Sequence, residues 1–93
     1  MIVSKRDKRV DALLLGDCPR RFPPDLLRAA QKKLIMLDSA RTLDALRSPP
    51  SNRLEALAGN RAGQHSIRIN DQWRICFLWQ DGDAHEVEIV DYH

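Results

Sequence analysis

The chain has 93 residues, which suits one domain with a modest core and is too small for two. Its hydrophobic fraction of 43% and charged fraction of 30% are those of an ordinary globular protein. No window approaches the roughly 18 apolar residues of a membrane span, and the charged start has no apolar signal core, so we expect no membrane contact and a cytoplasmic location.

The net charge of +2 is unevenly distributed along the chain. Residues 1–74 hold all 15 Lys and Arg and eight of the 13 acids, a balance of +7, whereas residues 75–93 carry five acids and no Lys or Arg. A basic body suits a partner that bears phosphates, because neutralising phosphates releases counterions. Solvated Lys and Arg on ordinary surfaces would give the same count, so charge alone leaves both interpretations open.

The N-terminal third predicts a short strand and a helix. Residues 2–3 are apolar and extended, and Ser4 with Asp7 three positions later matches a helix capping pattern. The first helix should continue to about Leu15 and stop at Gly16.

A second helix should begin at Pro23-Pro24 and end near Ser39, since proline fits a first helical turn. Its core face is predicted from helical spacing to hold Leu27, Ala30, Leu34 and Leu37. One more helical turn is expected over residues 42–46, a short strand over 53–57 and a loop over 58–63.

The C-terminal third alternates apolar and polar residues, which is the period of a half-buried sheet. It predicts strands over residues 65–69 and 73–79, and a third that ends on Asp91-Tyr92-His93. In the middle strand, Trp73, Ile75, Phe77 and Trp79 should share one face, and Arg74, Cys76 and Leu78 the other. The order of elements predicts a single α+β domain over residues 1–93, with two N-terminal helices packed on a small antiparallel sheet.

The sequence contains little evidence for a metal site or a cofactor site. Cys18 and Cys76 lie far apart without a CxxC spacing, which favours reduced thiols over a disulfide or a zinc site. His65, His85 and His93 never fall at a metal-ligand spacing. No glycine-rich phosphate loop is present, so we expect neither a metal nor a cofactor.

Several segments together resemble a known family. They are residues 52–57 (Asn-Arg-Leu-Glu-Ala-Leu), Gly59, Arg61, residues 63–75 (Gly-Gln-His-Ser-Ile-Arg-Ile-Asn-Asp-Gln-Trp-Arg-Ile) and residues 87–93 (Val-Glu-Ile-Val-Asp-Tyr-His). They resemble the HigB-type killer proteins of plasmid maintenance systems, which are RelE-like toxins of bacterial type II toxin-antitoxin modules. The resemblance implies a RelE-like fold and a ribosome-dependent endoribonuclease that cleaves messenger RNA in the A site and inhibits growth. It also implies a cognate HigA-type helix-turn-helix antitoxin, through which operator DNA is bound.

RNA cleavage without a metal uses the substrate's own 2′-OH, so the protein must supply a base, an acid and positive charge. Arg74 suits the last role, since a guanidinium matches two phosphate oxygens and keeps its charge, although it could be an ordinary surface Arg. His93 is the candidate for proton transfer, although chain ends often fray. Tyr92 could stack on a base or bond a phosphate, and Asp91 could orient His93 or take a proton. Strand alternation brings Asp91 and His93 together and turns Tyr92 away, unless the chain end bends.

Two positions depart from the family pattern. Where family members carry a histidine and a lysine before the Gly-x-Arg-x-Gly segment, this chain has Glu55 and Ala58. Glu55 could still transfer a proton, whereas Ala58 lacks a phosphate contact, so we expect a slower or more narrowly ribosome-dependent enzyme. The missing charge could come from RNA-binding residues Arg53, Arg61 and Arg68. The alternative is a non-catalytic protein of the same fold that acts by binding RNA, the ribosome or the antitoxin.

Overall fold

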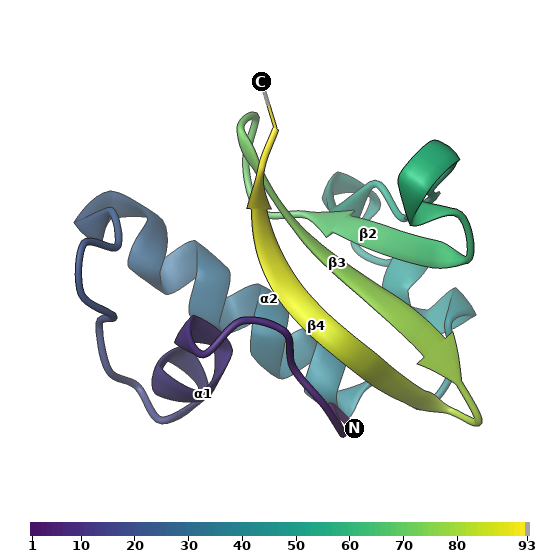
Figure 1. Cartoon of the computed structure of the whole chain (residues 1–93), viewed down its shortest axis with the longest axis horizontal. Helices are drawn as coiled ribbons and strands as arrows, with labels where there is room; N and C mark the ends of the chain where they lie inside the picture. The colour runs from purple at the N-terminus through teal and green to yellow at the C-terminus, as the bar shows by residue number, and fades with distance from the viewer. Residues whose placement is uncertain (93) are drawn as a thin grey trace.

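A computed structural model of the chain describes residues 1–92 (Figure 1). Its sheet has four antiparallel strands in chain order: β1 (Glu55–Ala56), β2 (Gln64–Arg68), β3 (Trp73–Gln80) and β4 (Asp83–Asp91). The α+β class and the antiparallel sheet are therefore confirmed. None of the helices within residues 1–92 has both the length and the apolar character needed to cross a membrane.

The helices precede the sheet. The structure has α1 (Arg9–Leu14) and α2 (Leu27–Ser39), and α2 ends where the sequence predicts. Short 3-10 helices lie between the larger elements: η1 (Pro24–Leu26), η2 (Asp44–Arg47), η3 (Pro50–Asn52) and η4 (Gly59–Arg61). The expected strand over residues 53–57 shrinks to β1, and at its start Arg53 adopts a left-handed conformation (φ 44°) instead of an extended one.

The two ends of α1 test the predicted N-terminal cap and the predicted stop of the first helix. Gly16 (φ +89°) stops the helix as predicted, since its N–H bonds Leu13 O while Asp17 N–H bonds Ala12 O, a Schellman arrangement. The predicted cap at Ser4 is wrong, because the helix begins at Arg9. The Ser4 hydroxyl instead accepts the main-chain N–H of Glu86 in β4 (2.8 Å).

The first residues of the chain run beside β4 and pair with it in parallel (Figure 1). Bridges join Ile2 to Ala84 and Lys5 to Val87, so the predicted N-terminal strand exists only as isolated contacts. Further along, the Asp7 carboxylate accepts the N–H of Ile89 (3.2 Å), and Arg9 donates to Ile89 O (3.0 Å). Main-chain and side-chain groups of residues 1–9 thus satisfy an edge that would otherwise be open to pairing with another chain.

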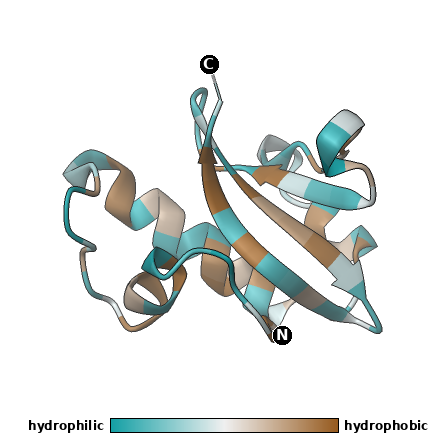
Figure 2. Cartoon of the chain, in the orientation of Figure 1, coloured by the Kyte–Doolittle hydropathy of each residue, from teal (hydrophilic) through white to brown (hydrophobic). Residues whose placement is uncertain are grey.

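The hydrophobic core lies between the helices and one face of the sheet. Figure 2 shows the alternation of apolar and polar residues along β4. Buried residues on the helical side are Val10, Leu13, Ala30, Leu34 and Leu37, and those on the sheet are Ile67, Ile75, Phe77, Ala84, Val87 and Ile89. The alternation in β4 changes phase at Glu86 (φ 51°), which forms a bulge opposite residues 76–78. Because of this bulge, Ala84, Val87 and Ile89 can all face the core.

The Asp7–Arg9 pair gives a test of this edge. Asp7→Ala should lower the free energy of unfolding at pH 7 by about 1–3 kcal/mol, because the Arg9 side chain and Ile89 N–H lose a charged acceptor. Burial opposes ionisation of Asp7, but hydrogen bonds from Arg9 and Ile89 outweigh it and lower the pKa. Because the pKa of Asp7 is lower in the folded than in the unfolded protein, its carboxylate stabilises the fold at pH values above the unfolded pKa of about 4. This stabilisation is lost as the pH falls through the folded-state pKa.

The measurement is urea unfolding of the wild type and Asp7→Ala at pH 7 and pH 3, with the exposed Asp17→Ala as the matched control. The difference between wild type and Asp7→Ala should shrink at pH 3, while Asp17→Ala should match the wild type at both values. An undiminished difference at pH 3 would show that the carboxylate charge does not hold this edge.

Candidate active site

A hollow of about 370 Å³ lies on the face of the sheet away from α1 and α2, which we name the outer face. The outer face is defined by the paired residues Ser66 and Cys76 and by the pair Arg68 and Arg74. The residues that line the hollow are Arg53, Glu55, Arg68, Asn70, Asp71, Arg74 and Tyr92. They come from the end of η3, from β1, β2, the turn after β2 and the start of β3, and from the residue after β4, so only the folded sheet brings them together.

Arg74 is the most buried cation at the hollow, with 8% of its surface exposed. Its Nε donates to the Ser66 hydroxyl (2.8 Å), and one terminal nitrogen, Nη2, donates to the main-chain oxygens of Arg53 (2.6 Å) and Ser66 (3.4 Å). These acceptors are all neutral. The other nitrogen, Nη1, has no hydrogen-bond partner within residues 1–92, and it remains the group able to bind a ligand.

The charge of Arg74 is poorly compensated. The carboxylate of Glu55 is 3.9 Å from Nη2, but the Glu55 side chain is 56% exposed, so solvent weakens this pair. A buried cation held by neutral oxygens carries a positive potential into the hollow, where the local dielectric is lower than in water. Such an arrangement suits an anion, and a phosphate above all, because donors are already oriented toward the place where negative charge develops.

The main-chain oxygen of Arg53 is placed by a buried polar cluster below it. Asn52 is fully buried; its amide oxygen accepts Lys33 Nζ (2.5 Å), and its amide nitrogen donates to Leu46 O (3.1 Å). Burial, with Lys32 and Arg68 nearby, lowers the pKa of Lys33. Asn52 thus links η3 to α2 and to η2. It directly precedes Arg53, whose main-chain oxygen accepts the hydrogen bond from Arg74.

Tyr92 forms the wall of the hollow at the chain end. Its hydroxyl lies 3.9 Å from the Cys76 thiol, and burial with this contact raises the pKa of Tyr92. Burial likewise raises the pKa of Cys76, which stays a thiol. Tyr92 therefore remains protonated near neutrality and can donate a hydrogen bond or offer its ring, as the sequence suggests, but it is no base at that pH.

Arg68 stands directly opposite Arg74 in the sheet, as expected from their strands. Like charges at such a position repel, and each side chain turns to a different partner. Arg68 pairs with Asp71, which is exposed, while Arg74 turns to Ser66 and Arg53. Asn70 shapes the turn between them, since its side-chain oxygen accepts the N–H groups of Gln72 (2.9 Å) and Trp73 (2.8 Å).

Two predicted site residues, Asp91 and Arg61, are not among the residues that line the hollow. Asp91 lies opposite Trp73 in the register, which directs it to the helical side, and Gln72 Nε2 donates to it (3.2 Å). Arg61 is on the outer face beyond the hollow, where Glu88 (2.5 Å) and Gln64 (3.1 Å) take its hydrogen bonds. His93 lies outside the described residues.

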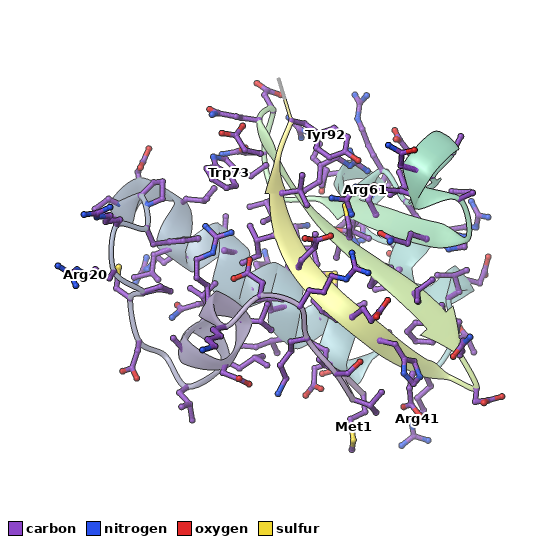
Figure 3. The ribbon with its side chains drawn as sticks, viewed as in Figure 1. Met1, Arg20, Arg41, Arg61, Trp73 and Tyr92 are labelled. Carbon is purple, nitrogen blue, oxygen red and sulfur yellow. The ribbon has the colours of Figure 1, made fainter. Side chains whose placement is uncertain are left out.

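Figure 3 shows the separation of the two sides of the sheet, since Trp73 lies on one side of β4 and both Tyr92 and Arg61 lie on the other. The side chain of Tyr92 therefore shares the face of Arg74 and points away from Asp91, as strand alternation predicts for neighbouring residues. The reason is the register, in which Arg74 pairs with Val90, two residues before Tyr92.

Sequence reasoning missed Ser66 and the main-chain oxygen of Arg53. Strand alternation alone could have placed Ser66 on the face of Arg68, since the two are two residues apart. No pattern in the sequence indicates that Arg53 offers its carbonyl rather than its side chain, because this depends on its left-handed backbone. Among residues 1–92, no three His, Cys, Asp or Glu side chains form a group that could hold a metal ion.

Comparison with known proteins decides the family. The sequence profile described as the RelE-like toxin of type II toxin-antitoxin system HigB matches residues 6–93. The chain belongs to this HigB family. It is 40% identical over 85 residues to Toxin HigB-1 of Vibrio cholerae serotype O1, which covers 90% of each chain. It is 29% identical to Endoribonuclease HigB of Proteus vulgaris over 93 residues, the whole of both chains.

A protein of Haemophilus influenzae described as uncharacterized is also similar, at 31% identity over 72 residues, or 77% of this chain and 71% of the other. The HigB match includes every residue that lines the hollow, from Arg53 to Tyr92. Membership of a type II toxin-antitoxin family implies an antitoxin partner.

Proposed function

We propose that this chain is the toxin of a type II toxin-antitoxin system and a metal-independent, ribosome-dependent endoribonuclease that cleaves messenger RNA in the A site. The observation that carries the proposal is the buried Arg74 guanidinium, held by neutral oxygens at a hollow that Tyr92 also lines. This is the electrostatic arrangement that a phosphorane requires.

In the proposed reaction the 2′-OH of the substrate attacks the adjacent phosphorus and the bond from phosphorus to the 5′-oxygen breaks. A base takes the 2′ proton, and an acid protonates the leaving oxygen, so the products end in a 2′,3′-cyclic phosphate and a 5′-hydroxyl. Glu55 is our candidate base, because it lines the hollow and stands 3.9 Å from Arg74. Arg74 Nη1 would bind the equatorial oxygens, and His93 is the proposed acid at the chain end.

Tyr92 and Arg68 complete the proposed site. Tyr92 would stack on a base or donate to a phosphate, a contact worth roughly 1–3 kcal/mol when it is stacking. Arg53 and Arg68 would bind the RNA backbone, which positions the strand without reading its sequence. Asp91 and Arg61 would act on the site only indirectly, since neither lines the hollow.

We include the ribosome in the proposal because Tyr92 is the only aromatic residue within residues 1–92 that lines the hollow. In-line attack needs the 2′-oxygen, the phosphorus and the leaving oxygen aligned, and rigid presentation of the strand can contribute several kcal/mol toward that alignment. We propose that the ribosome supplies it, which places the protein in the cytoplasm. A HigA-type helix-turn-helix antitoxin would neutralise the toxin and connect it to operator DNA.

A second function, binding without cleavage, is favoured because one expected positive charge is absent and another is already paired with a carboxylate. Ala58 is exposed where family members are expected to carry a lysine, and Arg61 is paired with Glu88. A protein with only Arg53, Arg68 and Arg74 at the hollow could bind an RNA phosphate without completing the proton transfers.

The test is primer extension on a reporter mRNA after brief induction of the protein, with an otherwise identical reporter that lacks a start codon. New 5′ ends in the translated message alone support the ribosome-dependent nuclease. A form lacking His93 should give about 10²-fold fewer new ends, because it lacks the proposed acid. Inhibited growth without new 5′ ends in either message would instead support the binding function.

A further inference from the structure

The hydroxyl of Ser66 is fully buried in β2 and cannot meet a substrate. Its one hydrogen bond within residues 1–92 is the 2.8 Å bond that it accepts from Arg74 Nε. Volume alone does not require a polar group at this position, since the buried neighbour across the strands is Cys76. The hydroxyl therefore has one evident role, which is to hold Arg74.

The second support of Arg74 comes from a different segment of the chain. The main-chain oxygen of Arg53 accepts Nη2 at 2.6 Å, and the main-chain oxygen of Ser66 lies 3.4 Å from the same nitrogen. A guanidinium is planar, so fixing Nε and Nη2 also fixes the direction of Nη1. A free arginine side chain has about 2 kcal/mol of rotamer entropy, and these supports remove that freedom before a substrate arrives.

We propose that Ser66 is a positioning residue, which orients the Arg74 guanidinium so that Nη1 meets the phosphate as negative charge develops. The inference rests on the proposed nuclease function and concerns the same site. Without the hydroxyl, Nε would lose its acceptor and the side chain could rotate about the remaining contacts of Nη2. A misplacement of about 1 Å at a reacting group can cost roughly 100-fold in rate.

A positioning role and a packing role of Ser66 predict different effects on cleavage when Ser66 is substituted. Ser66→Ala removes the acceptor, and Ser66→Cys keeps the shape while replacing the hydroxyl with a poor acceptor. Ser66→Thr retains a hydroxyl. Were Ser66 only a space-filling residue, the cysteine would serve as well as the serine. Ser39→Ala is the matched control, since Ser39 is exposed at the end of α2.

The experiment measures kcat and KM for cleavage of a defined mRNA on programmed ribosomes by the purified full-length proteins. Thermal unfolding of each variant is measured in parallel. Ser66→Ala and Ser66→Cys should lower kcat by about 10- to 100-fold with KM within about threefold of the wild type, because the contact acts mainly in the transition state. Ser66→Thr should restore kcat to within about fivefold of the wild type, and Ser39→Ala should leave it unchanged.

The inference is overturned if folded Ser66→Cys cleaves within about twofold of the wild-type kcat, or if the loss appears in KM alone. Should Ser66→Ala fail to fold, the cysteine variant decides by itself, since it preserves the volume of the side chain. A wild-type protein that produces no cleavage on the ribosome refutes the proposed function. A wild type that cleaves beside an equally active Ser66→Cys refutes only the role of Ser66.

Discussion

Arg74→Ala should slow cleavage of ribosome-bound mRNA by about 10²- to 10³-fold, which is the usual loss when one preorganised donor to a developing oxyanion is removed. The side chain is 8% exposed, and its Nη1 group is the one left without a partner in residues 1–92. The measurement is the single-turnover cleavage rate of an end-labelled message on programmed ribosomes. Growth inhibition should disappear, while the antitoxin should still bind the variant.

Arg47→Ala is the matched control for this prediction. Arg47 pairs with Asp44 at the surface, where both side chains are well exposed and the pair contributes little. Its loss should leave the cleavage rate within about twofold of the wild type. If Arg74→Ala cleaved as fast as Arg47→Ala, the guanidinium would have no part in the reaction.

Asn52→Ala should lower the free energy of unfolding by about 3–5 kcal/mol, because it leaves the buried Lys33 ammonium and the Leu46 carbonyl without their partner. Asn52 is fully buried and Lys33 is 8% exposed, so solvent compensates little for the loss. The measurement is the urea unfolding free energy at pH 7. The exposed Asn60→Ala, in η4 before β2, is the matched control and should change it by less than about 0.5 kcal/mol.

A second substitution at Lys33 tests the cause of that loss. Lys33→Met in the Asn52→Ala background removes the unpaired charge and replaces it with an apolar side chain of similar length. It should recover about 1–2 kcal/mol of the loss, since apolar replacements of buried ionic groups are often neutral or stabilising. Equal stability of the single and double variants would show that the charge of Lys33 is not what makes Asn52→Ala costly.

The sequence predicts the sheet and its faces well. Alternation from Trp73 to Trp79 assigns Phe77 to the core and Arg74 to the opposite face, and the structure agrees. The turn between β3 and β4 closes on Asp81 and Gly82, both with positive φ, which suits a two-residue hairpin. These features depend on residues near each other in sequence, where period and turn chemistry are sufficient.

The parts that could not be predicted depend on register and on the backbone. Whether Tyr92 or Asp91 joins Arg74 follows from which residue of β4 stands opposite Arg74, and alternation within one strand does not fix that pairing. Arg61 is a good phosphate ligand by type, but the fold places it beside Glu88. The left-handed Arg53, which directly follows the buried Asn52, presents its carbonyl to Arg74, and no sequence pattern indicates this backbone conformation.

The chemistry of the cleaved ends tests the central claim most directly. Ribosome-bound mRNA cut by the purified protein should yield a 5′-hydroxyl on the downstream fragment, which a kinase labels without prior phosphatase, and a 2′,3′-cyclic phosphate on the upstream fragment. Both ends should be missing from the Arg74→Ala reaction. A 5′-phosphate with a 3′-hydroxyl would contradict the account, because it would make water the nucleophile in place of the 2′-OH.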